Sequence, residues 1–342
     1  MGKRKTQALQ ADAAATTTAK AHAFTFGEPE PIDRASLLDY VQVWNNGRWY
    51  EPPISVLGLA NMLRTAPHHS SAIFIKRNLL VSSFVPTPYL SVAEFEAFAT
   101  DYLVFAHAYL EQIPAMSKRL LRLKRSPALF TRVGVNGGPC WFVPYTGEAF
   151  QFENPVCQLF APDVSQEIYG VPEYLSALHA AQLNKSATLF RRKYYDNGSH
   201  AGFILYMTDA AQQTADIDAL RDALKNSKGP GNFRNLFMYA PNGKKDGLQL
   251  IPISEVAAKD DFASIKNTSR DDILAAHRVP PQLLGMIPTN AGGFGDVEKA
   301  KRVFMENEVA PIQAKMLGLN TVLGVEAFRF QKAELMAGIS PT

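Results

Sequence analysis

The pattern of apolar and polar residues predicts two long helices in the second half of the chain. Between residues 172 and 198 no glycine or proline interrupts the sequence, and apolar residues recur at spacings of three and four. At 1.5 Å per residue this helix would be roughly 40 Å long. A second run, residues 254–277, places Ile265, Ser269 and Ile273 along one helical face. Two consecutive prolines end it, because proline lacks a backbone donor and disfavours helix at the residue before it.

The apolar residues of the first helix form two stripes. They are Val171, Leu175 and Leu178, then Leu183, Ala187, Phe190 and Tyr194. We expect a helix of this length to bury itself against a large surface.

Short apolar runs separated by turn residues predict a small α/β insert between the two helices. Residues 201–207, 236–239 and 248–253 are predicted strands, and the polar stretch 216–226 is a predicted helix. The insert therefore has the order strand, helix, strand, strand.

The first half of the chain is predicted to contain three helices followed by an antiparallel sheet. The helices are expected at 54–65, 70–82 and 91–107, the last with apolar residues at helical spacing. Alternation and Gly/Pro punctuation over residues 129–168 favour short antiparallel strands.

The C-terminal part is predicted to begin with a further helix, residues 297–310. Pro311 is expected to kink or interrupt this helix, which resumes through Met316. Residues 325–331 then predict a closing strand.

The composition is that of an ordinary globular protein. The 342 residues carry 35 Lys and Arg against 32 Asp and Glu, and a net charge of +3 is too small to argue for nucleic-acid binding. Cys140 and Cys157 suggest neither a disulfide framework nor metal-ligand spacing, so we predict buried thiols in a reducing compartment. No apolar run approaches the roughly 18 residues of a membrane span, so we expect no membrane partner.

Sequence motifs for catalysis or metal binding are missing. There is no nucleophile elbow, His-Glu-x-x-His or Cys-x-x-Cys pattern. His68 and His69 have no carboxylate or cysteine at ligand spacing, so we predict that they lie in a surface loop. Residues 292–295, Gly-Gly-Phe-Gly, lack the Gly-Lys-Ser/Thr of a phosphate-binding loop. We expect no enzyme activity, no metal and no cofactor.

Residues 116–126 form the most basic run in the chain. One interpretation is a solvated amphipathic helix or strand pair with Leu120, Leu121 and Leu123 inward. The other is a stripe that binds DNA or a partner. Its cations are Lys118, Arg119, Arg122, Lys124 and Arg125.

Four segments in a fixed order resemble the portal proteins of tailed bacteriophages, specifically the PBSX type of contractile-tailed phages. They are GVPEYLSAL, FRRKYYDNGSHAGFILY, DDILAAHRVPPQLLG and GGFGDVEKAKRVFMENEVAPIQ. The resemblance runs from about Phe24 to the C-terminus. It implies an α+β portal fold with a wing, a stem of long helices, a small α/β clip and a tunnel loop. The crown of longer portals would be short or absent.

The resemblance divides the chain into seven segments. They are a disordered basic tail (1–23), the wing (24–169), stem helix 1 (170–200), the clip (201–253), stem helix 2 (254–280), the tunnel loop and its helix (281–320), and a closing wing strand with the C-terminal tail (321–342). In this family the N-terminus is trimmed during capsid maturation, so cleavage within 21–26 is a hypothesis.

The resemblance also implies where DNA passes. The tunnel loop would be Thr289, Asn290, Gly292, Gly293, Phe294, Gly295 and Asp296. Basic candidates facing DNA are Lys185, Arg191, Arg192, Lys193 and Lys299, although those of the first long helix fit salt bridges between subunits equally well. From the residues alone, a plain surface loop is the other reading of 289–296.

The function implied is that of a head–tail connector. Twelve copies would form a ring at one capsid vertex of the virion, through which double-stranded DNA is packaged, retained and ejected. Expected partners are terminase, then head-completion or tail adaptor proteins, with capsid and scaffold proteins, during assembly in the bacterial cytoplasm. The alternatives are a non-catalytic nucleic-acid-binding protein that uses the basic run, or a phage structural adaptor without a DNA channel.

Overall fold

The computed structural model describes residues 43–164, 166–196, 203–207, 248–252, 258–286 and 296–331. The chain divides into two compact units. One comprises Met1–Ile32 and Arg192–Val256, and the other comprises Asp33–Arg191 and Ala257–Thr342. No helix in the described part of the chain is long and apolar enough to cross a membrane.

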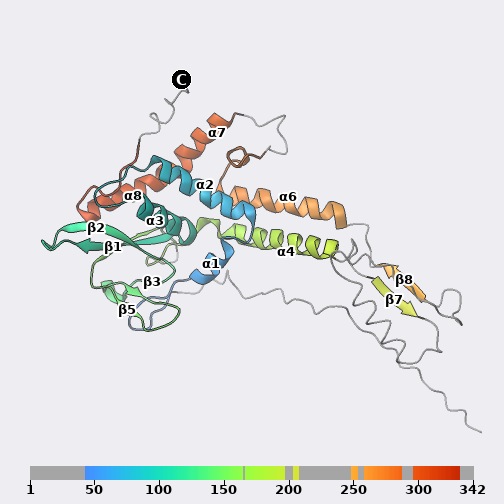
Figure 1. The fold of residues 1–342 in the computed structure, drawn as a ribbon, viewed down its shortest axis with the longest axis horizontal. Coiled ribbons are helices and arrows are strands. Elements are labelled where there is room, and N and C mark those ends of the chain that lie inside the picture. Colours follow the sequence, from blue (N-terminus) through green and yellow to red (C-terminus); the bar gives the residue numbers. More distant parts are fainter. Residues whose placement is uncertain are drawn as a thin grey trace, which may run out of the picture. The chain divides into compact units, whose positions relative to one another are not determined.

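Three helices open the described part of the larger unit, as the apolar spacing predicts. They are α1 (Val56–Met62), α2 (Pro67–Ser83) and α3 (Val92–Phe105) (Figure 1). Ser55 and Ser91 cap α1 and α3 with their side chains, which satisfies backbone donors that the first turn leaves open. The third helix ends two residues earlier than predicted, because Ala106 adopts a left-handed conformation with φ of 60°.

A three-stranded antiparallel sheet follows, with strand order β2-β1-β6. Its strands are β1 (His107–Pro114), β2 (Leu120–Ser126) and β6 (Val156–Phe160). Strand β1 was not predicted from the sequence. Its first four residues are all buried, so this strand lacks the alternation that marks a half-exposed strand.

A second antiparallel sheet has the order β3-β4-β5. Its strands have two residues each, β3 (Thr131–Arg132), β4 (Trp141–Phe142) and β5 (Phe150–Gln151), and Phe142 stacks on Phe150 at 5.2 Å. The predicted antiparallel strands of 129–168 are confirmed, although they fall into two sheets. Cys157 in β6 is buried as expected, whereas Cys140 is only half-buried.

The two predicted long helices are present and pack together. A short 3-10 turn, η2 (Glu173–Ser176), leads into α4 (Ala177–Asp196), and α6 spans Ala258–His277. The two lie side by side (Figure 1), and Asn184 of α4 is hydrogen-bonded to Ser269 of α6.

The buried face of α4 differs from the apolar stripes read from the sequence. Its fully buried residues are mainly small: Ala177, Ala181, Asn184 and Ala187, with Leu178 beside them. Leu183 and Phe190 of the second stripe remain 51% and 46% exposed. These mainly small residues therefore form the core-facing side of α4, while the larger apolar residues of the second stripe lie outside it.

In the smaller unit, β7 (Phe203–Met207) pairs antiparallel with β8 (Leu248–Pro252). These are two of the three strands predicted for the insert. The predicted helix 216–226 and strand 236–239 lie outside the described residues.

The C-terminal helical region is longer than predicted. After η3 (Pro281–Leu284), helix α7 (Val297–Phe304) runs through a π-helical turn, η4 (Met305–Val309), into α8 (Ala310–Leu323). The interruption expected at Pro311 is this π turn. Of the predicted closing strand 325–331 the structure shows only an isolated bridge, Phe84↔Phe330.

Candidate functional site

The loop that carries most of the expected DNA-channel residues lies outside the described residues. This applies to Thr289, Asn290, Gly292, Gly293, Phe294 and Gly295. Asp296 is described and forms the N-cap of α7. One carboxylate oxygen accepts from the Lys299 backbone N–H at 2.9 Å, and the other meets Lys299 Nζ at 2.9 Å. The Lys299 backbone hydrogen bond, followed by its side chain, lowers the pKa of Asp296. Asp296 therefore fixes where the loop ends and the helix begins.

The basic candidates of the first long helix lie on its outer surface. Lys185, Arg191 and Arg192 are exposed on α4. Lys193 belongs to the same helix, but its side chain lies outside the described part. These cations are available for contacts outside the subunit.

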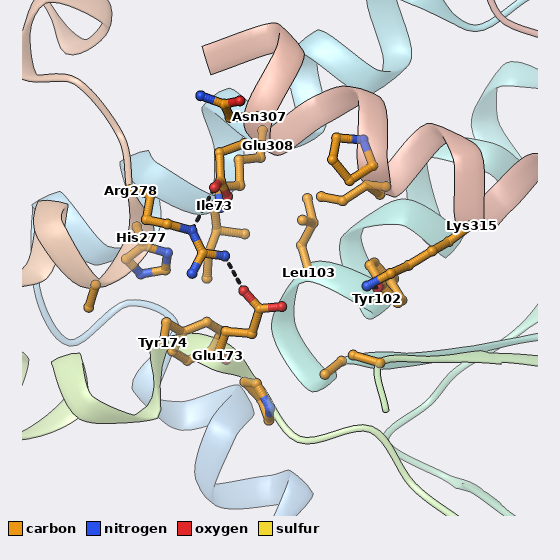
Figure 2. A pocket seen from close by; sticks show the side chains of 17 residues that line it. Ile73, Tyr102, Leu103, Glu173, Tyr174, His277, Arg278, Asn307, Glu308 and Lys315 are labelled. Carbon is orange, nitrogen blue, oxygen red and sulfur yellow. Dashed lines mark hydrogen bonds and ion pairs between the residues drawn. The ribbon is translucent and has the colours of Figure 1, made fainter. Parts of the chain in front are cut away.

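A charged cluster joins the two long helices to the helix that follows the loop. Arg278 comes directly after α6 in a left-handed conformation with φ of 55°. Its Nε donates to Glu308 of η4 at 2.6 Å, and its terminal nitrogen donates to Glu173 in η2, at the entry to α4. Figure 2 shows the guanidinium of Arg278 between these two carboxylates. We call Lys76, Glu173, Arg278 and Glu308 the helix-junction cluster.

Lys76 brings the core helix α2 into the same cluster. Its Nζ lies 2.9 Å from the second oxygen of Glu308, and the two side chains are 11% and 10% exposed. Burial lowers the pKa of Lys76, while the hydrogen bond that Lys76 donates to Glu308 opposes this shift. Loss of Glu308 would leave the Lys76 charge buried without its partner, a situation that costs about 3–5 kcal/mol.

The pKa shifts at Arg278 agree with this geometry. The hydrogen bond from Arg278 lowers the pKa of Glu173, and the bonds to Glu308 and Glu173 raise the pKa of Arg278. Arg278 is half-exposed, so solvent screens its pairs more than the pair between Lys76 and Glu308.

The π turn accounts for the position of Glu308. A π turn holds one more residue than an α turn and is common at functional sites. Phe304, just before the turn, and Val309, its last residue, are both buried. Pro311 lacks the N–H that an α-helix would direct to the carbonyl of Asn307, which favours the wider turn. The wider turn keeps both apolar residues in the core while Glu308 faces the junction.

A cavity of about 120 Å³ lies beside the cluster. Tyr102, His277, Lys315 and Asn307 contribute to its lining, and Lys315 Nζ lies 3.4 Å from the Tyr102 hydroxyl. This volume and polar lining suit ordered water.

Two histidines pack behind the cluster. His69 Nδ1 lies 2.9 Å from His277 Nε2, and the ring of Tyr174 contacts both. The prediction of a surface loop for His68 and His69 is wrong, because Pro67 begins α2 and His69 is directed into the core. Burial lowers the pKa of His69 to about 4 and that of His277 further. Among the described residues, no group of three or more His, Cys, Asp or Glu is placed to hold a metal.

The basic run, residues 116–126, contains β2, which is the outer strand of a hairpin with β1. This agrees with the interpretation of the run as part of a strand pair. Leu123 is buried, but Leu121 is exposed, contrary to expectation. Arg125 turns away from the other cations to pair with Asp101 at 2.6 Å. The remaining four cations are exposed: Lys118, Arg119, Arg122 and Lys124.

Sequence reasoning missed the helix-junction cluster altogether. The partners of its bonds lie 30, 105 and 232 positions apart, so no local spacing relates them. The only local hint is the position of Arg278 between the end of a helix and two prolines.

Comparisons with a family model and with known sequences all point to the same protein family. The phage portal protein family model matches residues 84–331. The chain is 52% identical over 340 residues to a probable portal protein of Escherichia phage P2, covering 98% of each chain. It is 33% identical over 290 residues to a probable portal protein of Haemophilus phage HP1, covering 82% of this chain and 84% of the other.

Comparison with solved structures confirms the α+β portal fold. One similar chain is in the neck of a native gene transfer agent particle computed with C12 symmetry (TM-score 0.55, 16% identity, 83% of this chain and 85% of that chain). Another is an HK97 family phage portal protein from Corynebacterium diphtheriae (TM-score 0.58, 16% identity, 82% and 97%). The chain therefore belongs to the phage portal protein family, whose members are structural head–tail connectors of tailed-phage virions.

Proposed function

We propose that twelve copies of this chain close into a ring around an axial channel at one capsid vertex. Genomic double-stranded DNA passes through this channel during packaging, is retained there, and leaves through it on ejection. The observation that carries the proposal is the 52% identity to the phage P2 portal protein over 98% of both chains. The similar fold in a neck computed with C12 symmetry supports the subunit number. A ring of this kind needs two different faces of each subunit that meet by rotation.

The DNA-contacting part of the channel is proposed to be the tunnel loop, residues 289–296. The N-cap formed by Asp296 at the first turn of α7 supports this assignment, because it gives the loop a defined end. Lys299, three residues after Asp296, is 75% exposed, which supports a contact of its ammonium group with phosphate.

The long helices are proposed to form the stem. The exposed cations of α4, Lys185, Arg191 and Arg192, with Lys193 beside them, either face DNA or pair with acidic residues of the next subunit. The buried hydrogen bond between Asn184 of α4 and Ser269 of α6 supports a stem in which the two helices are held together.

The insert of residues 201–253 is proposed to be the clip, which docks terminase first and head-completion or tail adaptor proteins later. Its place within the smaller of the two compact units supports an independent docking module. On this proposal residues 24–169 form the wing that meets capsid and scaffold proteins, and the protein is of the PBSX type. Assembly takes place in the bacterial cytoplasm, and a separate terminase ATPase supplies the work, so the portal itself needs no catalytic site.

A second candidate function is direct binding of nucleic acid by the hairpin. Four exposed cations within seven residues favour it: Lys118, Arg119, Arg122 and Lys124. Binding of this kind would weaken steeply with salt, whereas a channel has little grip on duplex offered from outside. A salt titration of duplex binding by the purified protein separates the two functions.

The test of the portal proposal is the native mass of the purified protein, with negative-stain images of the same sample. Closed rings with an axial hole are expected. Coexpression with capsid and scaffold proteins covers the case in which rings need a scaffold, and monomers under both conditions would refute the proposal. Deletion of residues 292–295 is expected to leave ring assembly intact and to reduce DNA packaging or retention; normal packaging would remove the loop from the mechanism.

A further inference from the structure

We propose that Glu308 is a positioning residue that sets the direction of α7 relative to the two long helices. Its two carboxylate oxygens meet two different parts of the fold. One oxygen lies 2.6 Å from Arg278 Nε at the end of α6, and the other lies 2.9 Å from Lys76 Nζ on α2. The importance of this for DNA handling rests on the proposed portal function.

Helix α7 has few other buried contacts that would fix its direction. From Val297 to Phe304 only the last residue, Phe304, is buried, and the helix otherwise packs against η3. The buried anchor of the helix is therefore at its C-terminal end, next to the π turn. Lys76 reaches this anchor as well, since its Nζ lies 6.0 Å from the centre of the Phe304 ring. The same lysine thus contacts the last residue of α7 and the carboxylate that follows it.

Because of the π turn, the direction of α7 depends on the ion pairs that Glu308 forms with Lys76 and Arg278. Successive helical residues are separated by about 100°, so a change of one residue in the register of this turn would move Glu308 away from both cations. The two pairs therefore stabilise one register of the turn. A π turn that relaxed toward α-helical geometry would lose them and would rotate α7.

Arg278 extends this link to the other long helix. Besides Glu308, Arg278 binds Glu173, which lies in η2 at the entry to α4. A displacement of α7 is thereby transmitted through ion pairs to the end of α6 and to the entry of α4. The helix-junction cluster is the point at which ion pairs connect the turn that follows α7 with the end of α6 and the entry to α4.

The first test compares Glu308→Gln with Glu306→Gln in the full chain. Glu306 lies on the same π turn but is exposed, so it controls for loss of one negative charge from this turn. We expect amide hydrogen exchange over residues 297–304 to become about tenfold faster in the Glu308→Gln protein and to stay unchanged in the Glu306→Gln protein. Unchanged exchange in both proteins, or equal acceleration in both, would overturn the proposal.

A second variant covers the case in which Glu308→Gln fails to fold. Arg278→Gln removes a half-exposed partner and leaves the pair between Lys76 and Glu308 in place. A smaller acceleration confined to α7, η2 and the end of α6 is expected. Exchange that is unchanged in these segments, or accelerated equally throughout the protein, would contradict the inference.

The functional readout is the amount of DNA retained in particles assembled with each variant. We expect Glu308→Gln rings to form normally and to retain less DNA than the Glu306→Gln control. Faster exchange in α7 with normal DNA retention would keep Glu308 as the residue that holds α7 but would refute its role in the channel. Failure of the wild-type chain to form rings, both alone and with capsid and scaffold proteins, would refute the proposed portal function and leave the exchange result unaffected.

Discussion

Asn184 on α4 donates a 2.8 Å hydrogen bond from Nδ2 to Oγ of Ser269 on α6, across 85 positions of sequence. Both residues are only 1% exposed and lie between the two long helices. The side-chain Oδ1 of Asn184 at this contact is buried without a hydrogen-bond partner. The contact between the two helices thus includes a buried polar pair, which a mismatched register would separate.

Breaking this pair from one side is expected to destabilise the larger unit. Ser269→Ala leaves the amide of Asn184 buried without an acceptor, at a cost of about 1–3 kcal/mol in the free energy of unfolding. The double variant Asn184→Ala/Ser269→Ala should cost less than the sum of the two single variants, since neither polar group then remains. Urea unfolding of the four proteins measures the coupling. Strict additivity would show that the hydrogen bond contributes no coupling energy.

The buried histidine pair predicts that stability falls in mild acid. Burial lowers the pKa of His69 from its ordinary 6.5 to about 4 and lowers that of His277 as well, with His69 adding to the effect. The unfolded chain therefore binds more protons than the folded chain below pH 6.5. The free energy of unfolding should decrease by up to about 1.4 kcal/mol per pH unit for each histidine as the pH falls from 6.5 toward 4.

The double variant His69→Asn/His277→Gln tests this assignment. An asparagine amide lies near the position of Nδ1 and a glutamine amide near that of Nε2, so the hydrogen bond between the side chains can be kept. The variant should show a shallower loss of stability between pH 6.5 and 4, retaining the part due to His107, whose pKa burial also lowers to about 4. A pH dependence identical to that of the wild type would show that the pair does not titrate in this window.

The buried carboxylate of Asp101 predicts a large effect at Arg125. Nε and a terminal nitrogen of Arg125 donate to the two oxygens of Asp101 at 2.7 and 2.6 Å. Burial raises the pKa of Asp101, and Arg125 opposes the shift. Arg125→Met should therefore lower the free energy of unfolding by about 3–5 kcal/mol, because the carboxylate loses its counter-charge.

Lys124→Met is the matched control, since Lys124 is an exposed cation on the same strand. It should change the free energy of unfolding by no more than about 0.5 kcal/mol. Equal effects of the two substitutions would mean that the pair with Asp101 contributes nothing beyond general charge.

Two glycines are expected to respond to the same substitution with opposite signs. A Cβ on Gly170 would lie 1.8 Å from the carbonyl oxygen of Ala106 and 2.8 Å from the backbone nitrogen of Ala161, whereas a Cβ on Gly318 in α8 would meet open space. Gly170→Ala should destabilise by about 3 kcal/mol, at the upper end of the cost of overpacking. Gly318→Ala should stabilise by about 0.5–1 kcal/mol, because alanine loses less entropy in a helix. Thermal unfolding measures both, and a shift of the same sign in both variants would contradict this account.

The local pattern of apolar, polar and helix-breaking residues predicted most of the helices and strands that the structure describes. The two long helices and the strands β7 and β8 were predicted close to their observed bounds, because three- and four-residue spacing, alternation and breakers act over short segments. The strand β1 was missed since its first four residues are all buried and show no alternation. The buried face of α4 was misjudged because alanines and Asn184, rather than Leu183 and Phe190, are the buried residues.

By itself the sequence determined the order of the elements and, through its resemblance to a family, the fold and the connector role. Only the tertiary structure decided that His69 meets His277 and that Glu308 meets Lys76 and Arg278. Helix and strand periodicity depends on neighbours within a few positions, whereas these contacts join groups up to 232 positions apart. They also depend on a π turn and on a left-handed arginine, two backbone states that these residue types do not specify locally.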